Sequence, residues 1–214
     1  MSAEEERELA EIKKDLSSMN AQDFYVKHIL KSKNWYFSTF QKFSGTDLVD
    51  KIDEFREIVS KHFKVNFYSV KMVGSAKVGY SLSPLKGFCK FHDETSGKDP
   101  SDIDVAIVSD KLYHYYWDKL RIEYYQNEYF KETDSFKDAA KSLFKGYLND
   151  EDLRKVDSIR SEWNNIVGPI NKELQARLFI QHPITYRLYR DWDDLQQYQI
   201  NGIIMTKHKL SNEE

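Results

Sequence analysis

The chain has 214 residues, of which 40% are hydrophobic and 31% are charged, so it can form a soluble domain with an apolar core. Its 32 basic and 35 acidic residues give a net charge of −3, which excludes a strongly basic field over the whole protein but not a local basic patch. The single cysteine, Cys89, excludes an internal disulfide bond. The sequence shows no secretory signal and no apolar run of membrane-spanning length, so we expect a cytoplasmic protein with no membrane partner.

The first 63 residues are predicted to be helical. Residues 3–18 carry a thin apolar stripe, and residues 23–43 form a second helix with an aromatic end. Ser44 to Asp47 resembles a capping box, and the helix that it begins has apolar residues at spacings of three and four as far as Phe63.

Two strands and a long loop follow the helices. Residues 66–73 are predicted to form a strand that ends at Gly74, and residues 75–81 a short helix whose N-terminus could accept an anion. The loop at 82–100 is long for a compact domain, which is typical of functional or disordered loops. It contains an acidic cluster, His92-Asp93-Glu94, which we interpret as solvated. The apolar run at 102–109 is typical of a central strand covered on both faces.

The remainder is predicted to be mostly helical, with one further strand. The predicted elements are helices at 111–130 and 135–148, a helix that starts at 149–150 and breaks at Gly168-Pro169, a helix from Pro169 to His182-Pro183, an edge or half-exposed strand at 184–190, and a mostly helical segment at 191–210.

Asp102 and Asp104 are the residues that most clearly indicate chemistry. Strand side chains alternate, so the two carboxylates project from one face of the predicted strand. Like charges held so close destabilise each other unless a cation lies between them, and a divalent cation with oxygen ligands suits the position. Upstream, the turn at Gly74-Ser75 offers backbone N–H groups and a hydroxyl to the phosphates that such a cation binds.

The segments MVGSAKVGYS and SDIDVAIV, which contain Gly74-Ser75 and Asp102-Ile103-Asp104, resemble the nucleotidyltransferase superfamily that includes DNA polymerase beta. The family pattern is a strand, a Gly-Ser turn, a short helix, and a strand with Asp-x-Asp. The resemblance covers about residues 66–110, and the flanking helices match only as general architecture. The spacing from Ser75 to Asp102 is longer than in compact members, and the loop at 82–100 accommodates the excess.

The resemblance implies a transfer of a nucleoside monophosphate from an NTP to the hydroxyl of an unknown acceptor, which could be a protein, an RNA or a small molecule. Asp102 and Asp104 would be catalytic and would hold Mg²⁺ or Mn²⁺. Gly74 and Ser75 would bind the nucleotide, with Lys77 as a further cationic contact. Small members of the superfamily serve in toxin–antitoxin or antiviral defence systems, and an oligomer is compatible with the resemblance.

The family also requires a third catalytic carboxylate on a neighbouring strand. Asp191, just past the predicted strand at 184–190, has the parity of Thr185 and Arg187 and is our candidate, with Asp193 and Asp194 as alternatives. Arg187 could instead pair with one of the two aspartates or bind phosphate. If no third acid reaches the site, the alternative is a catalytically inactive binding or regulatory module with the same fold.

These inferences predict an α+β fold: a short mixed β-sheet of the nucleotidyltransferase type with N-terminal, inserted and C-terminal helices. We expect one domain over residues 1–214, because no linker-like segment separates independent parts. Its predicted parts are N-terminal helices at 1–63, catalytic strands and loop at 64–110, a helical part at 111–181, and the third strand with a C-terminal helix at 182–214.

Overall fold

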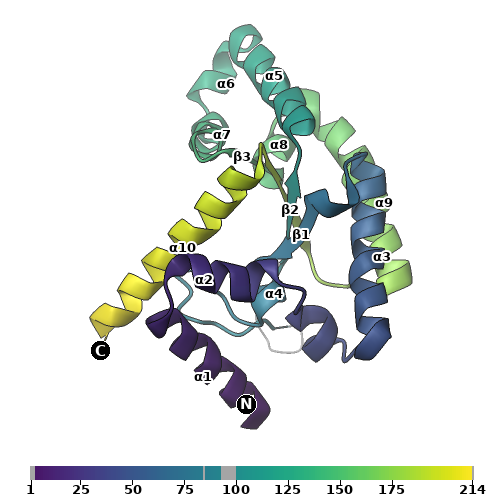
Figure 1. Ribbon diagram of the computed structural model, residues 1–214. Coiled ribbons are helices and arrows are strands. Elements are labelled where there is room, and N and C mark those ends of the chain that lie inside the picture. Colours follow the sequence, from purple (N-terminus) through teal and green to yellow (C-terminus); the bar gives the residue numbers. More distant parts are fainter. Residues whose placement is uncertain (1–2, 84, 93–99, 214) are drawn as a thin grey trace.

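The computed structural model describes residues 3–83, 85–92 and 100–213, and a small mixed β-sheet lies at its centre (Figure 1). The four strands are β1 Val70–Val73, β2 Ile103–Val108, β3 Tyr147–Asn149 and β4 Ile184–Tyr189, in the order β1-β2-β4-β3. β2 pairs antiparallel with β1 and parallel with β4, and β3 pairs antiparallel with β4. The prediction of an α+β fold with a short mixed sheet is therefore confirmed.

Helices cover both faces of this sheet. Those of the described residues are α1 Ala3–Ser18, α2 Ala21–Phe24, the π-helices η1 Tyr25–Leu30 and η2 Tyr36–Phe40, α3 Gly45–Phe63, the 3-10 helix η3 Phe67–Ser69, α4 Gly74–Val78, α5 Asp110–Gln126, α6 Glu128–Glu132, α7 Asp134–Phe144, α8 Asp150–Lys155, α9 Asp157–Leu178 and α10 Trp192–Glu213. In Figure 1, α3 and α9 lie side by side, α5 to α7 form a separate helical lobe, and α10 runs beside the N-terminal helices. Within these residues, no helix is long and apolar enough to span a membrane.

The alternation of side chains along β2 divides the core into two. Ile103, Val105 and Ile107 pack with the cluster that contains the apolar faces of α3 and α9. Ala106 and Val108 pack with the cluster formed by α1, α2 and α10. Asp102 and Asp104 have the parity of Ala106, so their carboxylates lie on the side of the sheet where α10 and the N-terminal helices pack.

The strand predicted at 184–190 is present as β4, but it is not an edge strand, and within it only Thr185 and Arg187 are partly exposed. β4 lies between β2 and β3, and Tyr186 and Leu188 are buried. The edges are β1 and β3. The sequence placed β3 in a helix, but α7 ends at Phe144, and Gly146, with φ of 80°, turns the chain into the strand.

Two predicted helix boundaries are also wrong. The predicted helix at 23–43 is interrupted, because Lys31 has extended backbone angles and the chain bends before Tyr36. The predicted break at Gly168-Pro169 does not occur, since Pro169 lies inside α9. Proline removes one helical hydrogen bond, but the apolar face of α9 is buried on either side of it, and this packing maintains the helix.

Other differences are local. The predicted strand at 66–73 is regular only from Val70, because the Asn66 side chain accepts a hydrogen bond from the Tyr68 N–H and caps a 3-10 turn. Asn127 divides the predicted helix at 111–130, since its side chain caps α6. Asp93 and Glu94, part of the predicted acidic cluster, lie outside the described residues.

Candidate functional site

The structure brings Asp102 and Asp104 together at the start of β2. Asp104 is level with Thr185 of β4 in the parallel ladder. The Thr185 hydroxyl lies 3.2 Å from Asp102 Oδ2 and 3.2 Å from Asp104 Oδ1. A hydroxyl has one proton to donate, so Thr185 can satisfy one carboxylate at a time and leaves the other open to a cation.

Gly74 lies directly against the Asp104 side chain. It follows β1, begins α4 and has φ of 66°, a left-handed conformation that favours glycine. A Cβ atom at this position would overlap Asp104 Oδ2 and lie 3.1 Å from Asp104 Cγ. Position 74 therefore needs glycine for two independent reasons, its backbone angle and the space that the carboxylate occupies.

Arg187 is the fourth polar residue of the cluster that Asp102, Asp104 and Thr185 form on this face of the sheet. It is two residues beyond Thr185 on β4, and its Nη1 lies 3.1 Å from Asp104 Oδ1. Its guanidinium carbon also lies 5.7 Å from the ring centre of Tyr198 on α10 and 6.0 Å from that of Tyr147 on β3. The aromatic rings and the carboxylate hold the guanidinium at the site.

Burial dominates the electrostatics of this group. The Asp104 side chain is 16% exposed, and burial raises the pKa of its carboxyl above the ordinary value. The positive charge of Arg187 opposes this shift, while the nearby charge of Asp102 adds to it. A cation that approaches Asp104 therefore stabilises the ionised form of its carboxyl group.

A cavity of about 560 Å³ lies next to these residues. Its lining includes Gly74, Ser75, Asp102, Asp104 and Arg187 on the sheet side, Lys86 and Lys145 at two loops, and Tyr198, Gln199 and Asn201 on α10. This volume falls within the usual range for small-molecule sites. Five of the seven residues that the sequence predicted for the site thus line one cavity.

Asp191, the predicted third carboxylate, lies elsewhere. β4 ends at Tyr189 and the chain bends, so strand alternation no longer determines where Asp191 points. Its Oδ1 accepts a hydrogen bond of 2.8 Å from the Asp194 N–H at the start of α10, and its Oδ2 one of 3.1 Å from Arg190. These bonds hold the pKa of Asp191 below its ordinary value. Neither Asp191 nor the alternatives Asp193 and Asp194 line the cavity.

Lys77 also points away from the cavity. Its amine is buried on the other side of α4, where it donates a 2.6 Å hydrogen bond to the Lys31 carbonyl and another to the Lys33 carbonyl. Burial, together with the nearby charges of Arg56 and Lys71, lowers the pKa of Lys77 to about 7. The residue is a structural link between α4 and the segment after η1.

This position predicts a distinctive pH dependence of stability. Between pH 7 and 10.5 the unfolded chain binds a proton at Lys77 that the folded protein lacks, so the free energy of unfolding rises with pH over this range. Lys77→Met removes this rise, which we expect to be a few kcal/mol. Urea unfolding of both proteins at pH 7 to 10 measures the difference. The hydrogen bonds lost in the variant lower its free energy of unfolding by the same amount at every pH. If the free energies of unfolding of the two proteins run parallel with pH, the burial of the Lys77 amine is contradicted.

Thr185 and Tyr198 are site residues that sequence reasoning did not select. Thr185 shares the parity of Arg187 on the predicted strand, so a search for hydroxyls on that face would have found it. Tyr198 had no such signal, because its position depends on the packing of α10 across the sheet.

Among the described residues, no group of three or more His, Cys, Asp or Glu side chains could hold a metal ion. Asp102 and Asp104 thus form a pair of acids and not a complete protein cage for a metal ion. Two carboxylates suit Mg²⁺, which in nucleotide sites takes one or two from the protein and the rest of its ligands from phosphates and water. The donor set is therefore compatible with a magnesium ion that takes its other ligands from outside the protein.

Comparisons of the chain with protein-family models, curated proteins and solved structures find no match.

Proposed function

We propose that this protein is a metal-dependent nucleotidyltransferase that moves a nucleoside monophosphate from an NTP to an acceptor hydroxyl. The observation that carries the proposal is the convergence of Asp102 and Asp104 above Gly74, at the edge of a cavity large enough for a nucleotide. The two acids and the glycine come from segments separated by the loop at 82–100. Their contact is therefore a property of the fold and not of sequence proximity.

Each residue has a role in this proposal. Asp102 and Asp104 hold Mg²⁺ or Mn²⁺, which when bound neutralises the triphosphate and lowers the pKa of the attacking hydroxyl. Gly74 leaves room for the Asp104 carboxylate, and the Ser75 hydroxyl offers the phosphate a hydrogen bond. Arg187 supplies a fixed positive charge, and Thr185 orients the carboxylates.

One observation favours a second candidate, a nucleotide-binding module that does not transfer. Arg187 forms an ion pair with Asp104, and Thr185 occupies the facing position on β4. Among the described residues, no third carboxylate joins the pair. A site with two acids and one guanidinium can retain a magnesium nucleotide without activating an acceptor.

Calorimetry tests the shared part of both candidates. We expect ATP or another NTP to bind with Mg²⁺ present and to bind at least about tenfold more weakly with EDTA, because the phosphates complete the ligands of the ion. Mg²⁺ without nucleotide should give little heat. Tight binding of Mg²⁺ alone, or NTP binding with the same affinity in Mg²⁺ and in EDTA, would overturn the assignment of the cavity as a magnesium–nucleotide site.

Label transfer from an α-labelled NTP separates the two candidates. Transfer to the protein itself, to added RNA or to small-molecule hydroxyls supports the transferase. Nucleotide binding with no transfer to any of these acceptors supports the binding module.

A further inference from the structure

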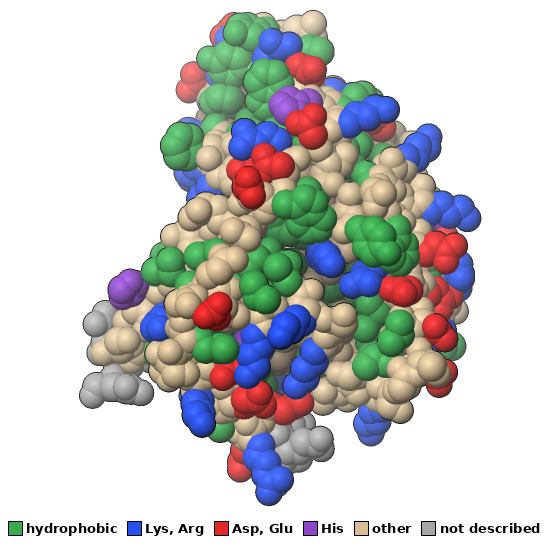
Figure 2. All heavy atoms as spheres, in the orientation of Figure 1, with side chains coloured by type: hydrophobic (Ala, Val, Ile, Leu, Met, Phe, Trp, Pro, Cys, Tyr) green, Lys and Arg blue, Asp and Glu red, His purple; other side chains and the backbone are tan. Residues whose placement is uncertain are grey.

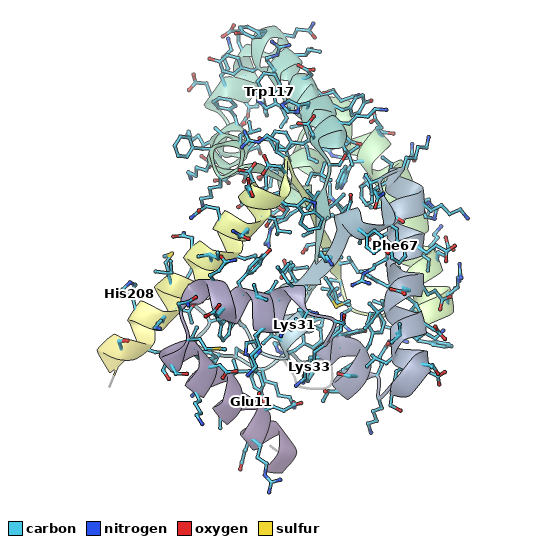
Figure 3. All side chains as sticks on the ribbon, in the orientation of Figure 1. Glu11, Lys31, Lys33, Phe67, Trp117 and His208 are labelled. Carbon is cyan, nitrogen blue, oxygen red and sulfur yellow. The ribbon has the colours of Figure 1, made fainter. Side chains whose placement is uncertain are left out.

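A second charged surface lies on the other side of α4 from the cavity. It comprises Lys31 and Lys33 after η1, Arg56 on α3 and Lys71 on β1, and we call these four residues the basic strip. Basic side chains gather in the middle of the face in Figure 2, with hydrophobic side chains beside them, and Figure 3 labels Lys31, Lys33 and Phe67 on this face. Arg56 and Lys71 line one small pocket together with Ser32, the residue between Lys31 and Lys33.

The basic strip has few acidic partners. Within the part of the chain that the structure describes, no carboxylate lies within ion-pair distance of Lys31, Lys33 or Lys71, and Arg56 pairs with Asp53 alone, at 2.9 Å. Burial and the charge of Arg56 lower the pKa of Lys71, as expected where positive charges lie close without compensation. An anionic ligand would relieve this repulsion.

The strip is also held in place. The buried Lys77 amine binds the carbonyls of Lys31 and Lys33 and so fixes the segment that presents these two exposed lysines. Glu8 and Glu11 line the same small pocket as Lys33, but Glu8 accepts a hydrogen bond from the Trp35 indole and Glu11 pairs with Lys27.

An aromatic pair extends the strip. The Arg56 guanidinium carbon lies 5.9 Å from the ring centre of Phe67, and the Tyr68 ring meets Phe67 edge to face at 5.2 Å. Apart from this contact, Tyr68 is 69% exposed. Most of the ring surface is therefore accessible to a planar group.

We propose that the basic strip and Tyr68 bind single-stranded nucleic acid. Cations that contact phosphates, next to an aromatic ring on which a base can stack, are the features that single-strand sites share. The pockets here have volumes of about 20 and 30 Å³, too small to enclose a nucleotide, so the ligand lies across the surface. None of the strip residues lines the cavity at Asp102, and the surface therefore stands independently of the proposed reaction.

Fluorescence anisotropy with a labelled single-stranded RNA, mixed-sequence and about ten nucleotides long, tests this proposal at low salt. K31Q/K33Q/K71Q should weaken binding at least about tenfold and reduce the slope of log Kd against log salt by about 2, because three phosphate contacts are lost. Tyr68→Ala should weaken binding about tenfold, and Tyr68→Phe should retain it, since the ring is kept. The control is K61Q/K111Q, which neutralises two exposed lysines outside the strip.

Circular dichroism and urea unfolding establish that each variant is folded. RNA binding that is unchanged in K31Q/K33Q/K71Q, or lost equally in K61Q/K111Q, would overturn the proposal. The proposal would also be overturned if heparin displaced the labelled RNA as well as unlabelled RNA does and Tyr68→Ala bound RNA with wild-type affinity. The surface would then be a general polyanion site.

Discussion

Asp102→Asn combined with Asp104→Asn is expected to lower transfer of label from an α-labelled NTP at least about a thousandfold, to background. The substitution keeps the size of both side chains and removes both negative charges, so the site can no longer hold the metal ion. The same variant should lose the magnesium-dependent part of NTP binding in calorimetry. The change relieves the repulsion between the two carboxylates but also leaves the Arg187 guanidinium without its ion pair, so urea unfolding of the variant establishes that it is folded.

Asp191→Asn is the matched control for this result. The structure gives Asp191 the role of a cap for α10, with bonds to Asp194 and Arg190 and none to the cavity. We expect transfer within about twofold of the wild type and a stability loss below about 1 kcal/mol, because asparagine caps a helix about as well as aspartate and the exposed ion pair with Arg190 contributes little. Retained transfer in the double Asn variant would refute the assignment of Asp102 and Asp104 as catalytic metal ligands, and a loss of transfer in folded Asp191→Asn would restore Asp191 as a catalytic acid.

The elements that the sequence predicted correctly are those whose local signals agree with their packing. α1 occupies residues 3–18 as its apolar stripe indicated, and α3 ends at Phe63. β2 is a central strand, as its continuous apolar run required. The failures depend on contacts distant in sequence: Tyr147–Asn149 becomes a strand only because β4 is available to pair with it, and Pro169 stays in α9 because the helix is buried against α3.

The candidate site divides in the same way. Alternation along one strand was enough to place Asp102 and Asp104 on one face, and the turn at Gly74 was visible as a Gly-Ser pair. The register between strands was not visible, so the position of Thr185 opposite Asp104 required the structure. Extrapolating strand parity past Tyr189 to Asp191 failed because the chain bends there. Lys77 follows Ser75 by two residues on the short helix α4, and at about 3.6 residues per turn two such side chains point to opposite sides of the helix.

Gly74→Ala is the second substitution with a large expected effect. A methyl group at position 74 overlaps Asp104 Oδ2, and Asp104 cannot retreat without giving up its contacts with Thr185 and Arg187. We therefore expect the carboxylate to move and magnesium-dependent NTP binding to weaken at least about tenfold. The left-handed backbone angle adds a strain of about 1–2 kcal/mol, which urea unfolding measures.

Gly45→Ala separates the strain from the loss of the site. Gly45 has φ of 57°, close to that of Gly74, but a Cβ there meets nothing within 4 Å. Its variant should lose about 1–2 kcal/mol of stability and bind NTP normally. The contradicting result is a Gly74→Ala variant that loses no more stability than Gly45→Ala and binds magnesium nucleotide with wild-type affinity. The position of the Asp104 carboxylate would then not depend on the space next to Gly74, and these two residues would not be part of a nucleotide site.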